Sequence, residues 1–539
     1  MSIGRSSLLL ASGTVVSRIL GFINAVVLAR TLGLVGSGAD AFALANQLPN
    51  NIYAIVAGGV LSAVLVPHIV KSGLNSDGGV KYINKLLTLG ISLFALVALI
   101  ATVAAPLWVG LYAQQSSGAG ELGFREADIR LAVAFAWWCL PQVFFYAIYS
   151  LLGEVLNAKE LFGPFTWAPV LNNIVAIGGM VWLSTVFSGS VSTATDWGAG
   201  EISILAGTAT AGVAAQALIL FFFLGRAGIR YRPDFRFRGV GLGETGRVAA
   251  WTLGMILVTQ LAGILQSNIA SLATTNGDPG LAVLRFGWLV FMLPHSVVTV
   301  SLATAYFTRM STDVRDGNWT SLSTDIRESL SRVGLFMVLA SAGLWVTAPF
   351  VAQVFDGSTN NGLAPVISLY AVGLVPFGIV FVLQRVFYAL GDTRTPFVVQ
   401  IAQAAVFSAL ALWVATGSTE TVATGLASAL SASTWVQALI MGVLLHRRLG
   451  KLFDRTEIAS LSTYVVAVIP AIALGLLVGN VTHGVLAAEW GTGILEAIVS
   501  GSVVAVVMTA AYMMALLVLR NDTATSVIAP LRNRGNNRA

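Results

Sequence analysis

The sequence predicts an all-α polytopic membrane protein with fourteen transmembrane helices, arranged as two six-helix lobes in a parallel pseudo-two-fold repeat plus helices 13 and 14. Three observations predict this fold: the composition, the length of the apolar segments and a pairing of prolines. Of 539 residues, 56% are hydrophobic and 10% are charged, whereas soluble domains carry about 25% charged residues. The apolar segments are too long and too numerous for the alternating strands of a membrane barrel.

Each predicted span is long enough to cross a hydrocarbon core, which needs about 20 residues. The fourteen apolar segments lie at 6–31, 41–70, 83–112, 129–157, 164–187, 201–225, 247–274, 281–308, 328–353, 364–390, 395–415, 421–445, 458–479 and 492–519. No cleavable signal peptide is evident, since the first apolar run continues through Arg18. The single cysteine, Cys139, lies inside an apolar segment, so no disulfide framework is expected.

The basic residues predict the orientation in the membrane. The even-numbered connections and the two termini hold 24 of the 30 lysines and arginines, and the odd-numbered connections hold only Arg125 and Arg130. Cytoplasmic loops of membrane proteins carry the excess of Lys and Arg. We therefore expect a multi-pass protein of the bacterial cytoplasmic membrane with both termini in the cytoplasm.

Prolines at matching positions predict the repeat. Leu48-Pro49 in the second segment corresponds to Leu293-Pro294 in the eighth, and Leu140-Pro141 in the fourth corresponds to Val375-Pro376 in the tenth. Similar sequences follow the fourth and tenth segments. A shift of six segments keeps the orientation of each helix, so the two halves are related by an axis along the membrane normal. The predicted division is 1–225 for the first lobe, 226–450 for the second, 451–520 for helices 13 and 14, and 521–539 for a cytoplasmic tail.

Four arginines fall inside apolar segments: Arg18, Arg30, Arg285 and Arg385. Arg30 and Arg385 are close enough to a helix end for their side chains to reach the interface. Arg18 is deeper, about 18 Å from the start of its segment at about 1.5 Å per residue. A guanidinium at that depth keeps its charge and needs water, a partner or an anionic ligand.

The sequence carries no pattern of an enzyme or of a cofactor or metal site. It has no Walker A motif, its four histidines are scattered, and no nucleophile–base grouping is readable. Glu154, near the inner end of the fourth segment, pairs most simply with Lys159. Deep arginines without matching acids favour an anionic substrate, and a phosphate or pyrophosphate suits a guanidinium fork. No cofactor and no nucleic acid is expected.

Several stretches together resemble the MurJ (MviN) family of lipid II flippases. They are SRILGF at 17–22, DAFALANQLPN at 40–50, GGVLSAVLVP at 58–67, FTWAPVLNNIVAI at 165–177 and RVFYALGDTRTPF at 385–397. The resemblance implies the fold of the multidrug/oligosaccharidyl-lipid/polysaccharide exporters. It also implies two lobes around a cavity, a lipid-tail groove formed by helices 13 and 14, and lipid II as the substrate.

The resemblance also implies which residues contact the substrate. Arg18 matches the cavity arginine of the first helix, and Asp40 matches the acid that opens the second. Asn24 and Tyr53 stand where many members carry arginine, and Arg285 lies one helical turn before the family's arginine position in the eighth helix, which is leucine here. The expected substrate-binding residues are Arg18, Asn24, Asp40, Tyr53 and Arg285, with Arg30, Glu154 and Arg385 as secondary candidates.

Three alternatives to a lipid II flippase remain open on the residues alone. An exporter of another undecaprenyl-linked saccharide, or a drug antiporter, would share the fold, but an antiporter of cationic drugs would favour deep acids over deep arginines. A non-transporting scaffold for cell-wall enzymes would not need a costly mid-membrane cation. Membrane-embedded glycosyl transfer is disfavoured by the absence of converging carboxylates.

Overall fold

The computed structural model describes residues 3–72, 80–116, 121–159, 161–187, 193–237, 246–357, 362–450 and 455–527. Side chains are described in the same ranges except at 3–11, 58–72, 162, 246–249 and 455–456. Within these residues the regular elements are helices, and extended pairing is limited to one bridge between Gln115 and Phe124. The predicted all-α fold is confirmed.

The chain divides into two compact units, Met1–Ala282 and Val283–Ala539. The elements of unit 1 are α1 (Ile3–Leu32), α2 (Ser37–Ser72), α3 (Val80–Val103), α4 (Ala105–Tyr112), α5 (Glu126–Cys139), α6 (Gln142–Ala158), α7 (Phe162–Val186), η1 (Ala194–Asp196), α8 (Ala199–Arg226), α9 (Gly246–Ser271), η2 (Thr274–Asn276) and the first residues of α10 (Leu281–Pro294). Unit 2 continues α10 and adds a π-helical turn η3 (His295–Thr299), α11 (Val300–Asp316), α12 (Trp319–Asp356), α13 (Leu363–Ala389), α14 (Arg394–Val414), η4 (Thr419–Thr421), α15 (Val422–Leu449), α16 (Arg455–Trp490) and α17 (Ile494–Val518).

Thirteen helical segments of the described chain are long and apolar enough to cross a membrane. Each coincides with one of the predicted spans. The predicted span at 41–70 is α2, whose side chains are described only as far as residue 57. Large apolar side chains point outward on these helices, with Val103, Leu107 and Trp413 each about three-quarters exposed, as acyl-chain contact requires. The chain is a multi-pass membrane protein, and the count of fourteen spans stays a prediction.

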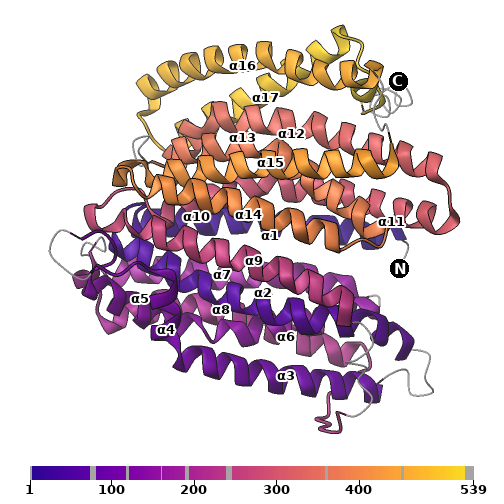
Figure 1. The fold of residues 1–539 in the computed structure, drawn as a ribbon. Coiled ribbons are helices and arrows are strands. Elements are labelled where there is room, and N and C mark those ends of the chain that lie inside the picture. Colours follow the sequence, from indigo (N-terminus) through magenta and orange to yellow (C-terminus); the bar gives the residue numbers. More distant parts are fainter. Residues whose placement is uncertain are drawn as a thin grey trace. The chain divides into compact units, whose positions relative to one another are not determined.

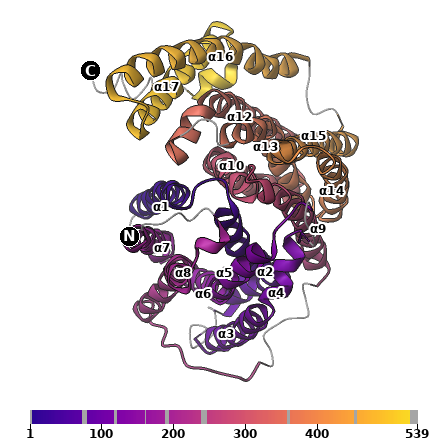
Figure 2. The same ribbon diagram turned by 90° about the vertical axis from the view of Figure 1, so that its left-hand side faces the viewer.

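Unit 1 is a helical bundle. In the end-on view of Figure 2, α1 lies beside α7, α7 beside α8, and α8 beside α6. α3 packs on the other side of α6, and α2 packs on α5 and α6. α9 packs on α2 and α4, so the helix predicted to open the second lobe belongs by its contacts to unit 1.

Unit 2 contains the same order of neighbours among α12, α13, α14 and α15. Figure 1 shows α12, α13 and α15 side by side, and α14 packs on α15. The pairs α14–α15, α13–α15 and α12–α13 correspond in order to α7–α8, α6–α8 and α3–α6 of unit 1. This correspondence is what a shift of six helices requires, and the superposition of the two halves stays a prediction.

The paired prolines act differently in the two units. Pro141 separates α5 from α6, and Pro294 is followed by the π turn, because a proline removes an N–H and crowds the preceding carbonyl. The helix continues through Pro49 and Pro376. A further break, after Val103, precedes Pro106 in the first turn of α4. Sequence equivalence of these prolines therefore does not produce equal kinks.

α16 and α17 pack against each other and against α12. The buried cluster they share includes Val346 from α12, Tyr464 and Ala471 from α16, and Met508 and Tyr512 from α17. The Tyr512 hydroxyl donates a 3.1 Å hydrogen bond to the Leu335 carbonyl of α12. These helices lie outside the predicted repeat, yet they are tied to it through α12 by both apolar packing and a buried hydrogen bond.

Three helices extend well beyond their predicted spans. α11 ends at Asp316 instead of residue 308. α12 begins at Trp319 instead of residue 328, with the Asn318 side chain accepting a hydrogen bond from the Ser321 N–H at its N-terminus. α16 continues to Trp490 instead of ending near residue 479. Polar residues outside the hydrocarbon are compatible with a helix, so the apolar run marks the membrane portion and not the helix end.

Candidate functional site

Arg18 lies at the middle of α1, the sixteenth of its 30 residues. That position is roughly 22 Å from either helix end at about 1.5 Å per residue. The side chain is half-buried, while Val15 and Ile19 beside it are 56% and 54% exposed. A cation therefore lies at the centre of α1, beside exposed apolar side chains.

The helix that carries Arg18 is held by α7. The Asn173 amide of α7 donates a 3.2 Å hydrogen bond to the Ser17 carbonyl, and its oxygen accepts a 3.5 Å hydrogen bond from Asn24. Gly13 has no room for a side chain, because a Cβ there would come within 2.7 Å of the Trp167 ring. These contacts bracket Arg18 and fix its helix, so Asn24 lies at a helix–helix contact with Asn173.

The only feature of the sequence that draws attention to Asn173 is that it follows a second asparagine, Asn172, within an apolar segment. Asn172 lies against Gly212 of α8, where a Cβ would come within 2.5 Å of its side-chain oxygen. The two amides thus face two different helices, α1 and α8. Together they position the centre of α7 in the bundle.

Asp40 is buried at the beginning of α2 and its carboxylate is occupied by protein donors. It accepts hydrogen bonds from the Thr274 hydroxyl at 2.7 Å and from the Ala282 N–H at 2.8 Å. Gly280 approaches so closely that a Cβ would lie 2.7 Å from the carboxylate. These contacts join α2 to the connection after α9, which supports a structural role for Asp40. Its predicted role in substrate binding stays a prediction.

Tyr53 and Glu154 are half-buried and belong to one polar wall of unit 1. Tyr53 on α2 lies 6.0 Å from the ring of Tyr146 and 6.1 Å from that of Phe94, and Glu154 of α6 is close enough to act on it electrostatically. The Tyr146 hydroxyl donates to Gln142 at 3.1 Å. Tyr53 and Glu154 thus lie in the same part of unit 1, and their role in substrate binding stays a prediction.

Gln142 extends this wall at the break between α5 and α6. Its amide donates to Thr210 at 2.9 Å and to Asn46 at 3.4 Å, and Thr210 donates to the Trp138 carbonyl freed by the break. A buried amide satisfied on both sides stabilises the irregular backbone beside Pro141. The pattern of the sequence predicts the break but not this network, whose members lie 68 and 96 residues from Gln142.

In unit 2, Arg385 lies among aromatic rings. Its guanidinium is 4.8 Å from the ring centre of Phe381, 5.7 Å from that of Phe307 and 5.9 Å from that of Tyr388. Among the residues that the structure describes, no carboxylate comes within ion-pair distance of it. Cation–π contacts of this kind contribute about 0.5–2 kcal/mol, so Arg385 is held by its neighbours and does not depend on reaching the interface.

Arg285 is half-buried on α10, and Arg30 is exposed near the end of α1. Arg18 belongs to unit 1 and Arg285 to unit 2, so a common site that contains both stays a prediction. The stretch GGVLSAVLVP at 58–67 lies outside the described side chains.

The π turn after Pro294 contains two polar side chains that no pattern in the sequence marks. His295 and Thr299 are buried, and within the described chain His295 Nδ1 and Thr299 Oγ1 have no hydrogen-bond partner. The imidazole packs edge-on against Phe377 and Phe381. Buried polar groups without partners are uncommon, and both of these lie in the irregular turn that follows Pro294.

The connection between α13 and α14, within the stretch RVFYALGDTRTPF, is organised by Asp392. Its carboxylate accepts from the Thr395 N–H at 2.9 Å and hydroxyl at 2.8 Å, and pairs with Arg448 of α15. Burial raises the pKa of Asp392, but the hydrogen bonds from Thr395 and Arg448 outweigh it and hold this pKa below its ordinary value. Asp392 therefore caps α14 and links it to α15.

Solved structures of membrane transporters share this helical fold. A lipid II flippase MurJ in an inward closed conformation aligns with a TM-score of 0.68 at 18% identity, over 95% of this chain and all of that one. An inward-facing multidrug resistance MATE family transporter of the MOP superfamily aligns with a TM-score of 0.63 at 17% identity, over 81% of this chain and 95% of that one. At these identities the likeness concerns the fold.

The family is shown by the sequence comparison. The family described as Lipid II flippase MurJ matches residues 28–501, and the chain belongs to it. A probable lipid II flippase MurJ of Haemophilus influenzae is 26% identical over 71% of this chain and 75% of its own length. A probable lipid II flippase MurJ of Rhizobium meliloti is 26% identical over 82% of this chain and 80% of its own length. The resemblance read from the sequence stretches is confirmed.

Proposed function

We propose that the protein moves lipid II, the undecaprenyl-pyrophosphate-linked disaccharide-peptide of peptidoglycan synthesis, from the inner to the outer leaflet of the cytoplasmic membrane by alternating access. Membership of the family over residues 28–501 supports this substrate. The observation that carries the proposal is Arg18, a half-buried cation at the centre of α1 whose helix is fixed by Asn173. A fixed guanidinium gives a pyrophosphate a bidentate partner at mid-depth.

The chemistry explains why a protein is needed at all. A pyrophosphate carries about two negative charges, and an unpaired charge buried in hydrocarbon costs many kcal/mol. Polar side chains that remain partly accessible, such as Tyr53 and Tyr146, lower this cost by replacing water around the headgroup. An exporter of another undecaprenyl-linked saccharide would face the same barrier and differs only in the sugar it carries.

Depletion of the protein in its own bacterium tests the function. We expect lipid II to accumulate on the inner leaflet and to resist an externally added enzyme that cleaves it, and we expect re-expression to restore cleavage. Intact accessibility of lipid II after complete depletion, with another lipid-linked saccharide trapped inside, would favour the alternative exporter. If every lipid-linked saccharide stayed accessible from outside after depletion, the result would favour the non-transporting scaffold.

We further propose that both termini lie in the cytoplasm, on the positive-inside rule applied to the connections. The native Cys139 is fully buried, so a single introduced cysteine reports alone. Glu121→Cys, in the connection before α5, should react with a membrane-impermeant thiol reagent in intact cells. Asp316→Cys, at the end of α11, should react only after permeabilisation. Both residues are exposed, and the opposite labelling pattern would reverse the orientation.

A further inference from the structure

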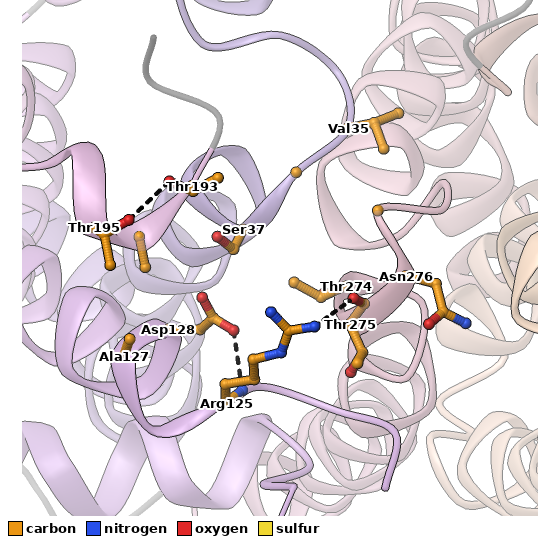
Figure 3. A pocket seen from close by; sticks show the side chains of 13 residues that line it. Val35, Ser37, Arg125, Ala127, Asp128, Thr193, Thr195, Thr274, Thr275 and Asn276 are labelled. Atoms are coloured by element: carbon orange, nitrogen blue, oxygen red, sulfur yellow. Dashed lines mark hydrogen bonds between the residues drawn. The ribbon is translucent and has the colours of Figure 1, made fainter. Parts of the chain in front are cut away.

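Unit 1 contains a polar pocket of about 540 Å3 at one end of its helices. Arg18 is not one of the residues that line it. Figure 3 shows its wall, formed by the connections after α1, before α5, around η1 and after α9. Its polar lining includes Ser37, Arg125, Asp128, Thr195, Thr275 and Asn276. Small-molecule sites measure about 300–1,000 Å3, so the volume fits a ligand of sugar size or larger.

The pocket is built on a rigid rim. The Arg125 guanidinium donates a 3.2 Å hydrogen bond to the Thr275 carbonyl, and the Gly123 N–H donates to the Thr275 hydroxyl at 2.8 Å. Gly123 has φ +128°, and a Cβ there would lie 2.4 Å from the Gln114 carbonyl, so only glycine fits. On the other side, Asp40 fixes Thr274 through a 2.7 Å hydrogen bond. Walls fixed before a ligand arrives reduce the entropy lost on binding.

The charges of the lining favour a polyhydroxylated ligand over a bare anion. Arg125 extends into the middle of the pocket, between Asp128 and Thr274 (Figure 3). Asp128 accepts a 2.9 Å hydrogen bond from the Arg125 N–H, and its charge balances the guanidinium. Hydroxyl and amide groups make up the rest of the polar wall. One cation, one anion and several neutral donors and acceptors match the hydroxyl and amide groups of an amino sugar.

The position of the pocket agrees with the charge pattern of the sequence. All four connections that form it are odd-numbered, and these connections contain only two basic residues, Arg125 and Arg130. Arg130 is exposed and pairs with Glu126 on α5. Arg125 is therefore the basic residue of these connections that faces the pocket, on the side predicted to be extracytoplasmic.

We propose that this pocket binds the amino-sugar headgroup on the extracytoplasmic side, after the headgroup has passed Arg18. The inference rests on the proposed lipid II translocation and adds a second saccharide site to it. The guanidinium of Arg125 and the hydroxyls of Ser37 and Thr195 bind the sugar and its N-acetyl group. A site made within unit 1 holds the headgroup whatever position unit 2 takes.

Binding of a soluble, lipid-free disaccharide-peptide of the peptidoglycan type to the full chain in detergent tests the site. Calorimetry should show saturable binding, and Arg125→Gln should weaken it at least tenfold. Ala127→Phe, which fills the pocket from the half-buried Ala127, should weaken it similarly. Arg130→Gln on the same helix is the matched control and should bind as the wild type does. The thermal midpoint of each variant shows that it is folded.

The outcomes separate this site from the proposed function. The probe lacks pyrophosphate, so Arg18→Ala should leave its binding unchanged. Loss of binding in Arg18→Ala but not in Ala127→Phe, or no binding to the wild type at millimolar probe, would overturn the pocket. Leaflet accessibility of lipid II in cells tests translocation independently, so a wild type that flips lipid II but binds no probe refutes the pocket alone.

Discussion

Arg18→Ala should abolish lipid II translocation while leaving the protein folded and inserted. In the proposed function a pyrophosphate meets this guanidinium at the centre of α1, so its removal should leave the headgroup without a cationic partner. Arg18→Lys should retain part of the activity, because an ammonium keeps the charge but loses the bidentate geometry. Arg285→Ala should have a milder effect. Growth of a flippase-depleted strain, with membrane abundance measured by immunoblot, is the assay.

A control arginine lies outside the candidate residues. Arg226 is exposed at the end of α8, and Arg226→Ala should support growth. Full growth on Arg18→Ala at normal abundance would show that Arg18 is a tolerated structural cation and not the substrate contact. If Arg18→Ala is poorly inserted, Arg18→Gln replaces it in the test, because glutamine keeps hydrogen-bonding capacity without the charge. Loss of growth in Arg18→Gln at normal abundance would support the proposed substrate contact, and full growth would contradict it.

The composition and the apolar segments predict most of the helices, because burial in lipid demands that every backbone polar group be satisfied within its own segment. Pro141 and Pro294 mark two of the interruptions, since proline removes a donor wherever it falls. The sequence does not distinguish them from Pro49 and Pro376, through which the helix continues. Neighbouring helices decide which of these prolines interrupts its helix.

The candidate site was predictable in its charges but not in its contacts. Arg18 is marked by a charge in an apolar run, which costs free energy and so needs a reason. The partner that fixes its helix, Asn173, is 156 residues from Ser17, and the donor to Asp40, Thr274, is 234 residues away. Local patterns do not encode which distant polar residue completes a hydrogen bond. For the same reason the pocket around Arg125, assembled from four connections, was not visible in the sequence.

Glu496 links α16 and α17 to α12 through hydrogen bonds. The Glu496 carboxylate is buried in the first turn of α17 and accepts three hydrogen bonds. The donors are Gln353 of α12 at 2.7 Å, Ser500 at 2.9 Å and His483 Nδ1 of α16 at 3.0 Å. One side chain thus joins three helices at the end where α12 finishes.

Glu496→Ala should therefore destabilise the packing of α16 and α17 on α12. Gln353 and Ser500 are buried and would each lose the hydrogen bond to this carboxylate, at about 1–3 kcal/mol for each bond. Gln353 keeps its 3.4 Å hydrogen bond to the Gly493 carbonyl, and the half-exposed His483 turns to water. We expect a loss of about 2–4 kcal/mol and a lower thermal midpoint in detergent. Glu496→Gln should lose less, since its amide oxygen still accepts. Glu489→Ala, an exposed acid at the end of α16, is the control and should unfold as the wild type does. An unchanged midpoint for Glu496→Ala would mean that apolar packing alone holds these helices.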